Sequence, residues 1–528
     1  MKLATFKRKE FIAGLLAGVL VTWLGYSAYR FWMAPFLPAA FSDLLFAIVP
    51  GPLQAQAIKL LGSGAKLLSF YLFIVAQIVA FEWAGLRVVQ TPRGVALSSP
   101  IQRYLQPWLK IAIIILGLLL LLSLTGMSIN WSWEALVAVA VGTAALYVAL
   151  VKCFDLLLRV SFAKSSEPLD ERDSRYTRRD LLATLVSTAG AALMWPLLAH
   201  DLSGQGSTSS DPLKSSAQMI LPPPSRFDSI PGLPSRVTPT GQFYYVSKNL
   251  LPHQASVWGP LRIEGLVEHT LTLSLLELQT LPAIEHFVTL VCVDYEPNNP
   301  STNDLISTAL WQGVSLQTLI AQAGVRPEAT TIELYATDGY STAIPLQLIL
   351  ENPAMLLAYR MNGQPLDARH GLPIRLISPG LYGFKNIKHL NQIVLSKGEY
   401  SGYWERRGWA QQAPVKLLSK VTTPEAGSRL ERDMPVWIAG VAFAGKDGIS
   451  AVEVSVDGGQ RWEPAELEAP LSPFSWRRWA YRWVPSQTGG FVFIVRATDG
   501  HGRLQDYVET SAFPAGATGY HSVPVQVN

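Results

Sequence analysis

The chain has 528 residues, of which 49% are hydrophobic and only 16% are charged, and its formal net charge at neutral pH is +4. The charge is small and no basic patch is interleaved with aromatic residues, so we expect no nucleic-acid partner. The length predicts about three or four domains rather than one. The two cysteines, Cys153 and Cys292, are too few for a disulfide framework.

The hydrophobic excess lies before residue 200 and predicts a membrane region. Crossing a bilayer takes about 20 apolar residues. Stretches of about that length occupy residues 11–33, 66–89, 107–128, 133–158 and 181–199. A shorter stretch at 36–49 ends in Pro-Gly-Pro and is more typical of a re-entrant or interfacial segment. We therefore expect residues 1–199 to form an α-helical region of about five transmembrane helices.

The positions of Lys and Arg predict the orientation of these helices. The chain start and the loops at 87–110 and 159–180 are basic and should face the cytoplasm, whereas the uncharged loop near 127–132 should lie outside. The chain is then a multi-pass protein of the cell (inner) membrane, with everything after residue 200 on the periplasmic or extracytoplasmic side. Cys153 and Cys292 would be separated by the membrane and unable to pair.

Two further features of the membrane region bear on its function. Arg178 and Arg179, followed by a mild apolar run, resemble a twin-arginine export signal, although ordinary positive-inside flanking explains them equally well. All eight histidines are at position 200 or later, so paired histidine ligands for a haem are missing from these helices. We expect no haem there, and anchoring is the default role.

The remainder of the chain divides by composition into three parts. Residues 200–240 are rich in Pro, Ser and Gly and predict a linker. Residues 241–418 mix short strand-like runs with helical stretches and predict an α+β domain. Residues 419–528 alternate strand-like runs with Gly and Asp-Gly turns, which is typical of an all-β, immunoglobulin-like sandwich.

A series of motifs in the α+β part carries a family resemblance. Residues 356–393 contain Asn-Gly-x-Pro-Leu, His-Gly-x-Pro-x-Arg, Pro-Gly and Gly-x-Lys-x-x-Lys in this order. With the stretches at 310–325, 338–346 and 402–409, they resemble the sulfite oxidase family of molybdopterin enzymes. The tail resembles the immunoglobulin-like dimerisation domain of that family. The resemblance covers about 241–515 and implies an oxidoreductase with a molybdenum-molybdopterin cofactor that can dimerise through its C-terminal domain.

Cys292 follows the apolar run 286–291 and precedes an acidic, Pro- and Asn-rich loop. From these residues alone, a buried core cysteine is the favoured interpretation. The resemblance implies instead that it supplies the thiolate ligand of molybdenum, a role that suits a soft sulfur donor. It also implies a catalytic role for Tyr340, as a donor to oxygen on the metal; a half-buried strand tyrosine is the alternative.

The resemblance further implies a set of residues that hold the pterin and its phosphate, for which cations and converging hydrogen-bonding groups are needed. These predicted cofactor-binding residues are Tyr244, Tyr245, Lys248, Asn249, His370, Arg375, Asn386 and Lys388. Arg406 and Arg407 are weaker candidates for the mouth of the pocket.

The chain departs from the family pattern directly after Cys292. Sulfite oxidases carry arginine-rich residues there, whereas this chain has Asp294 and Glu296, which disfavour a dianion at short range. We therefore expect a neutral or cationic substrate, or a sulfoxide, rather than sulfite. The His-Pro-Gly-Gly motif of a cytochrome b5 module is absent from the sequence, so a separate electron-transfer partner such as a cytochrome is expected.

Together these features predict a membrane-anchored molybdenum-cofactor oxidoreductase that catalyses two-electron oxygen-atom transfer on a small molecule outside the cytoplasm. The alternative is a non-catalytic, membrane-anchored binding or scaffold protein that retains the fold. Bound molybdenum distinguishes the two, because a scaffold would need neither Cys292 nor the cofactor-binding set.

Overall fold

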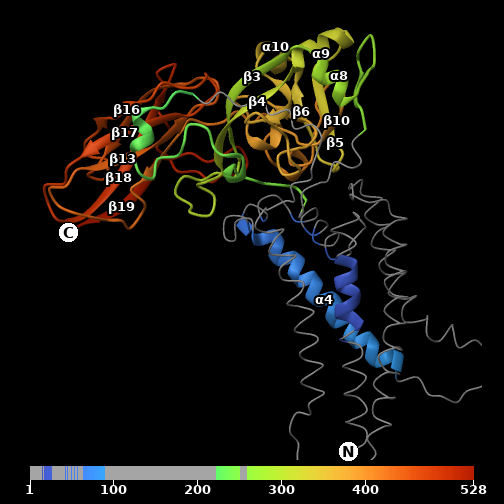
Figure 1. Cartoon of the computed structure of the whole chain (residues 1–528), viewed down its shortest axis with the longest axis horizontal. Coiled ribbons are helices and arrows are strands. Elements are labelled where there is room, and N and C mark those ends of the chain that lie inside the picture. Colours follow the sequence, from blue (N-terminus) through green and yellow to red (C-terminus); the bar gives the residue numbers. More distant parts are fainter. Residues whose placement is uncertain are drawn as a thin grey trace, which may run out of the picture. The chain divides into compact units, whose positions relative to one another are not determined.

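The computed structural model describes residues 222–249 and 259–528, the helix at 64–89, residues 17–26 and a few single positions before residue 64. The chain forms two compact units, residues 1–48 with 66–210 and residues 49–65 with 211–528. Figure 1 shows their helices and strands. The second unit contains every predicted site residue.

In the N-terminal part, helix α4 spans Gly64–Val89. The Gln77 amide donates a hydrogen bond to the Thr22 hydroxyl at 3.0 Å, which joins α4 to the helical residues 17–26. Among the described residues, no helix has both the length and the apolar character needed to cross a bilayer. The spans predicted at 107–128, 133–158 and 181–199, and the Arg178-Arg179 pair, lie outside the described residues.

The first region of the second unit contains two sheets. The strands of one follow the order β2-β1-β10-β5-β6; their bounds are Leu271–Leu273, Leu261–Gly265, Leu390–Ser396, Thr331–Ala336 and Ser341–Pro345. The other has the order β3-β4-β7-β8, with β9 also paired to β7; its strands are Ala283–Val291, Ile306–Ser315, Leu356–Met361, Gln364–Pro365 and Arg375–Ile377. Three short α-helices, α8 (Leu275–Thr280), α9 (Leu316–Ala323) and α10 (Leu346–Glu351), accompany the sheets.

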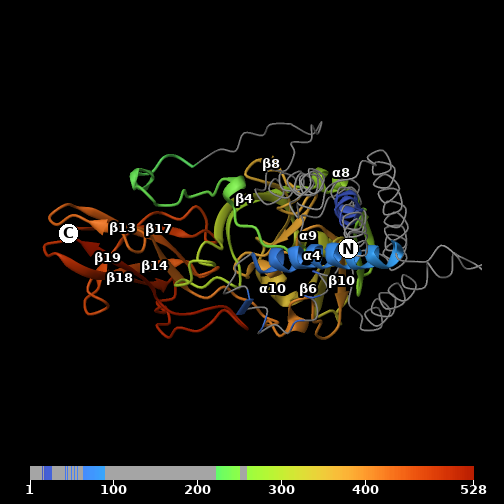
Figure 2. The same ribbon diagram turned by 90° about the horizontal axis from the view of Figure 1, so that it is seen from below.

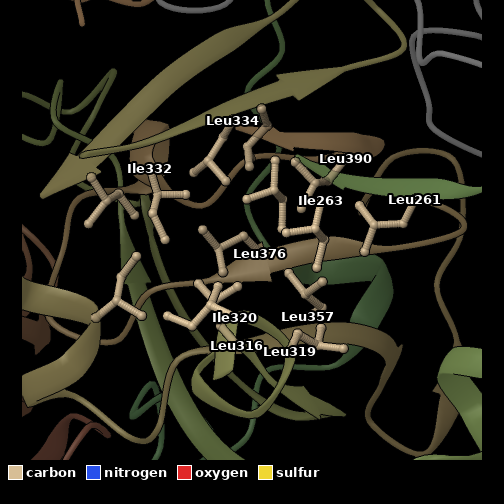
Figure 3. Close-up of a cluster of buried hydrophobic side chains, with 14 of the residues drawn as sticks. Leu261, Ile263, Leu316, Leu319, Ile320, Ile332, Leu334, Leu357, Leu376 and Leu390 are labelled. Carbon is tan, nitrogen blue, oxygen red and sulfur yellow. The ribbon is translucent and has the colours of Figure 1, made fainter. Parts of the chain in front are cut away.

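Helix α9 illustrates how local sequence positions these elements. The Ser315 hydroxyl accepts a hydrogen bond from the Thr318 amide and caps its start, and the helix ends at Gly324, whose φ of +70° suits glycine. Its buried side chains, Leu316, Leu319, Ile320 and Ala323, recur at helical spacing. They join the core formed with Ile263, Leu334 and Leu376 from the strands (Figure 3).

The second region is β-rich, as predicted, and Figure 2 shows its strands gathered towards the C-terminus. One sheet has the order β11-β13-β17-β16; its strands are Leu418–Thr423, Val436–Phe443, Arg477–Trp483 and Glu466–Leu467. The other has the order β12-β19-β18-β14-β15; its strands are Arg429–Leu430, His521–Val527, Gly489–Asp499, Ile449–Ser455 and Glu463–Pro464. Side chains of both sheets, including Trp479 and Phe493, fill a shared core, which is the arrangement of a sandwich.

The end of the segment predicted as a linker is packed against this sandwich. Phe227, in the short 3₁₀ helix η1 (Arg226–Ser229), is buried against Ala439 and Ala480. The buried Arg478 guanidinium donates to the Asp228 carboxylate at 2.7 Å and to the Glu468 carboxylate at 2.6 Å. The composition of this segment is typical of a linker, yet the buried Phe227 ring and the Asp228 carboxylate hold it against the sandwich. A second 3₁₀ helix, η2 (Thr240–Gln242), leads towards the pocket described below.

We predict that His521 makes the stability of the C-terminal region sensitive to acid. Its buried Nδ1 accepts a hydrogen bond from the Val421 amide at 3.0 Å, and burial lowers its pKa from 6.5 to about 4, with a further contribution from Lys420. Between these two values the unfolded chain binds more protons, so the unfolding free energy falls as pH falls, by about 3 kcal/mol in all. Thermal unfolding at pH 7 and pH 5 measures this loss.

The control is His521→Gln, which keeps an acceptor at the position and cannot titrate. Its transition should move less between the two pH values than that of the wild type. An equal shift in both proteins would contradict the role assigned to His521.

Candidate active site

A pocket of about 890 Å³, measured out to its open mouth, lies in the second unit. It is lined by residues from segments that are far apart in the sequence, including 243–248, 290–294, 338–340, 369–375, 383–388 and 404–409. Of the ten predicted site residues, nine line this pocket: Tyr244, Tyr245, Lys248, Cys292, Tyr340, His370, Arg375, Asn386 and Lys388. The tenth, Asn249, lies just behind the wall, where its amide donates to Asp338 at 3.2 Å. The structure therefore brings the predicted set together.

Cys292 directly follows strand β3, and its backbone is fixed on both sides. Its amide donates to the Leu305 carbonyl at 3.0 Å, and its carbonyl accepts from the Tyr295 amide at 3.1 Å. Leu290 and the residues at 292–294 line the pocket, whereas Val291 and Tyr295 are buried in a cluster with aromatic residues of the C-terminal region. The buried neighbours on both sides thus hold Cys292 at the pocket.

The surroundings of Cys292 disfavour a free thiolate. Burial raises the pKa of its thiol, and the neighbouring Asp294 carboxylate, with Oδ2 at 3.9 Å from the sulfur, raises it further. Burial, with a contribution from Glu296, also raises the pKa of Asp294 to about 7. A thiolate at this position requires a strong positive charge beside it, and a coordinated metal ion supplies one.

Glycine permits the close approach of a second loop to Cys292. Gly383 begins the 3₁₀ helix η4 (Gly383–Lys385). A Cβ at this position would lie 2.6 Å from the Tyr244 hydroxyl and 3.7 Å from Cys292 Cα. A larger residue would therefore displace the Tyr244 hydroxyl and crowd the Val291 carbonyl oxygen, which would lie 3.3 Å from the Cβ.

Two cations also line the pocket, the buried Arg375 and the partly buried Lys388. The Arg375 guanidinium donates to the carbonyls of His370 and Asn386 at 3.1 and 3.0 Å. The Lys388 ammonium donates to the carbonyls of Val246 and Arg369 at 2.9 and 3.2 Å. Burial lowers the pKa of Arg375 to about 10 and that of Lys388 to about 7.

The bonding partners of these cations indicate whether the pocket suits an anionic cofactor. Within the described part of the chain, Arg375 and Lys388 bond to neutral carbonyl oxygens rather than to carboxylates, and Arg375 Nε is a buried donor without a partner. The Asp367 carboxylate favours the charged form of both cations, and Asp338 favours that of Lys388, but burial has the larger effect and lowers both pKa values. A ligand with a phosphate and a polar ring would compensate both cations and use the open donor. The pocket therefore fits such a group.

The aromatic and polar residues of the predicted set support this wall. The Lys388 ammonium lies 4.4 Å from the centre of the Tyr245 ring. Burial lowers the pKa of His370 to about 4, so its ring is neutral at physiological pH, and its Nε2 lies 3.1 Å from the Thr240 carbonyl oxygen. The Asn386 side chain accepts from the Ser378 amide at 2.7 Å. Its amide group donates to two further carbonyls, so Asn386 shapes the loop around the pocket.

Tyr340 lines the pocket, with its hydroxyl already engaged. It donates to the Phe384 carbonyl at 2.7 Å, and burial raises its pKa well above the ordinary value. In this arrangement the hydroxyl oxygen can accept a hydrogen bond, whereas donation to a ligand requires release of the Phe384 contact. The catalytic role of Tyr340 stays a prediction.

Some features of the site differ from expectation. Glu296 is outside the lining and its carboxylate accepts from the Ala512 amide at 3.1 Å, so the expectation that it lies beside the metal was wrong. Arg406 and Arg407 do not line the pocket either, and the Arg407 guanidinium stacks 3.6 Å from the centre of the Tyr403 ring.

Sequence reasoning missed several lining residues, namely Asp338, Arg369, Phe384, Trp404 and Trp409. Each lies within a stretch that carries the family motifs, so their position in those motifs was the signal. What the sequence did not show is which side chains of each stretch face inward.

Comparison with known proteins assigns this architecture. Residues 251–404 match the family model described as the oxidoreductase molybdopterin binding domain, and residues 409–523 match that of the Mo-co oxidoreductase dimerisation domain. The uncharacterized oxidoreductase YuiH of Bacillus subtilis is 36% identical over 149 residues, which cover 28% of this chain and 71% of that protein. The chain belongs to the sulfite oxidase family of molybdopterin-dependent oxidoreductases.

The matches to other relatives cover only part of those proteins. Mitochondrial sulfite oxidase of Rattus norvegicus is 30% identical over 272 residues, which cover 44% of this chain and 50% of that protein. The chain thus spans about half the length of the mammalian relatives it matches. The structure of the sulfane dehydrogenase SoxCD from Paracoccus pantotrophus is 22% identical, with a TM-score of 0.45, and the match covers 51% of this chain and 74% of that one.

Membership of the sulfite oxidase family confirms the predicted molybdenum-molybdopterin cofactor. Arg375, Lys388 and the residues around them would hold the pterin and its phosphate, and Cys292 would hold the metal.

We predict that Lys388→Met weakens retention of the molybdenum cofactor by roughly tenfold to a hundredfold, because a charge-assisted hydrogen bond is lost from a buried wall. Molybdenum per chain, measured by mass spectrometry after dialysis, and pterin fluorescence report the loss. The matched control is Lys397→Met, which changes an exposed lysine of the same region. Equal cofactor content in both variants would remove Lys388 from the binding set.

Proposed function

We propose that this protein is a membrane-anchored molybdenum-cofactor oxidoreductase that catalyses two-electron oxygen-atom transfer on a small neutral or cationic substrate outside the cytoplasm. The observation that carries the proposal is the shared pocket of Cys292, Arg375 and Lys388. A thiol and two cations in one pocket suit a cofactor that carries both a metal and a phosphate. Family membership supports the reaction class.

The residues of the pocket have distinct roles in this proposal. The cofactor, when bound, supplies two-electron redox chemistry coupled to transfer of one oxygen atom. Arg375 and Lys388 bind its anionic end, and Cys292 fixes the position of its metal. The aromatic walls formed by Phe384, Trp404 and Trp409 exclude water, which strengthens electrostatic interactions inside the pocket.

Asp294 argues against sulfite as the substrate. Its carboxylate lines the pocket, 3.9 Å from the Cys292 sulfur. An arginine at this position would attract a dianion, whereas a carboxylate repels it. In its ionised form, which prevails above its pKa of about 7, this carboxylate repels a nearby dianion by an energy on the order of a few kcal/mol at the effective dielectric constant of a protein. Neutral molecules, sulfoxides among them, and cations avoid this repulsion.

The reaction balances in either direction with one additional component. In reduction, a sulfoxide would lose its oxygen as water and take up two protons and two electrons, which a separate electron carrier supplies. In oxidation, the substrate would gain an oxygen atom from water and release two protons and two electrons to that carrier. We propose a cytochrome as the carrier, a multi-pass anchor in the cell membrane, and a homodimer formed through the C-terminal domain, for which the matched dimerisation domain is the support.

A non-catalytic scaffold is the less favoured function. Burial lowers the pKa of Arg375 and of Lys388, so keeping both charged costs folding free energy, and a scaffold would gain nothing from that cost. The site is therefore better explained by the bound cofactor.

Metal analysis of the full-length protein tests the proposal. We expect about one molybdenum per chain in the wild type, and a loss of the bound metal in Cys292→Ser, because an alcohol is a poor substitute for a soft thiolate ligand. Elemental analysis with a screen of sulfoxides, N-oxides and sulfite, using artificial electron donors and acceptors, gives both metal content and substrate class. A correctly folded wild type without metal, isolated from a host that makes the cofactor, would support the scaffold.

We further predict that Asp294→Asn raises kcat/KM for sulfite relative to a sulfoxide by about tenfold, because one like charge is removed from the pocket. Steady-state kinetics on both substrates check the ratio. Glu399→Gln is the control, since it neutralises an exposed carboxylate of the same region. An unchanged ratio in Asp294→Asn would show that another group decides the substrate charge.

A further inference from the structure

A loop of the C-terminal region packs behind the pocket. It comprises residues 510–520 and is called the brace here. Its two ends are joined by a backbone bridge between Thr510 and Thr518, whose hydroxyls lie 2.8 Å apart. Because the loop is closed on itself, it can act as a rigid support.

The first contact of the brace is with the loop that follows Cys292. The Ala512 amide donates to the Glu296 carboxylate at 3.1 Å. The Asn298 side chain donates to the Tyr520 carbonyl at 2.9 Å and accepts from the Ser522 amide at 3.0 Å. Glu296 and Asn298 therefore connect the Cys292 loop to the brace at both of its ends.

The second contact reaches Cys292 from the other side. A Cβ on Gly516 would lie 2.1 Å from the Tyr382 hydroxyl, so the brace and this side chain are in direct contact. Lys416 secures the same point by donating to the Gly516 carbonyl at 2.6 Å. Tyr382 directly precedes Gly383, the residue whose backbone approaches Cys292.

The third contact supports the pocket wall itself. The rings of Phe513 and Trp409 meet edge to face with centroids 5.2 Å apart. The Ala410 amide donates to the Pro514 carbonyl at 3.0 Å. Trp409 lines the pocket, so the brace holds a wall residue as well as the loop of the predicted ligand.

The core behind β3 makes the same connection through apolar contacts. Val291 and Tyr295 pack in one cluster with Phe443, Trp476 and Ala512. Cys292 lies between two residues that are anchored in this cluster, so the direction of its thiol depends on C-terminal side chains.

We infer that the brace is a positioning element for the Cys292 thiol, with Glu296 and Asn298 as positioning residues that act through the loop backbone. The inference rests on the proposed role of Cys292 as the metal ligand. It gives the C-terminal domain a part in the geometry of the site in addition to dimerisation. When the brace contacts are lost, the loop populates open conformations in which the thiol leaves its position.

The experiment uses the full-length chain and changes the contact from both sides. Glu296→Ala removes an acceptor on the Cys292 loop, and Gly516→Ala adds a methyl group against Tyr382. Glu296→Gln is the conservative variant, because its amide oxygen can still accept from Ala512. Glu399→Ala is the control for loss of a carboxylate at an exposed position.

Two measurements report the thiol without relying on turnover. The first is the rate at which iodoacetamide alkylates Cys292 in protein from a host unable to make the cofactor, followed on the Cys292 peptide by mass spectrometry. The second is the Mo(V) electron paramagnetic resonance spectrum of the loaded protein, which is sensitive to the thiolate ligand. We expect alkylation to be about fivefold faster in Glu296→Ala and Gly516→Ala. Loss of one hydrogen bond raises the population of the open loop conformations by about this factor. Their spectra should be shifted or heterogeneous, while Glu296→Gln and Glu399→Ala match the wild type.

One combination of results would contradict the inference. If Glu296→Ala and Gly516→Ala lower the unfolding temperature but keep the wild-type alkylation rate and spectrum well below it, the brace is only structural and the inference is overturned. If the wild-type protein contains no molybdenum when it is made in a host that synthesises the cofactor, the proposed function is overturned instead. The alkylation rates would still decide whether the brace positions the thiol.

Discussion

The cations Arg375 and Lys388 impose the constraint on which the site depends. Carbonyl oxygens accept hydrogen bonds from both, but Arg375 Nε has no partner and the carbonyls carry no compensating charge. Burial lowers the pKa of Lys388 to about 7, so its charged form is disfavoured without an anionic ligand. An anionic ligand reverses that cost, so cofactor binding and stability of the folded domain are linked. The other features of the pocket keep these cations and one thiol in the same lining.

A single sheet connects Arg375 to the thiol. Strand β3 delivers Cys292 at its end, and β9 begins at Arg375. Both strands belong to the same sheet, through β4 and β7, so the distance between the two sides is set by backbone hydrogen bonds. Glycine at 383 then allows a third segment to close over the gap. A pocket built in this way is held by regular structure, which is the most reliable means of keeping functional groups in place.

Part of this arrangement could be predicted from the sequence and part could not. Cys292, Arg375 and Lys388 lie in motifs whose spacing is characteristic, so the family resemblance placed them in one pocket. The orientation of Glu296 and Asn249 depends on partners at sequence separations of 216 and 89 residues, Ala512 and Asp338. No local pattern encodes such contacts, and the acidic residues after Cys292 therefore looked equivalent although only Asp294 lines the pocket. The same reason explains why residues 222–240, with the composition of a linker, pack against the β-sandwich.

The attachment of Asp228 to Arg478 has a consequence for the covalent chain. These two residues flank the molybdopterin domain in sequence, one before it and one after it, and a buried guanidinium joins them. The segment that enters the molybdopterin domain is thus held against the sandwich by non-covalent contacts as well as by the polypeptide. A single proteolytic cut between the molybdopterin domain and the sandwich would therefore leave the two fragments associated under native conditions, and only a denaturant would separate them.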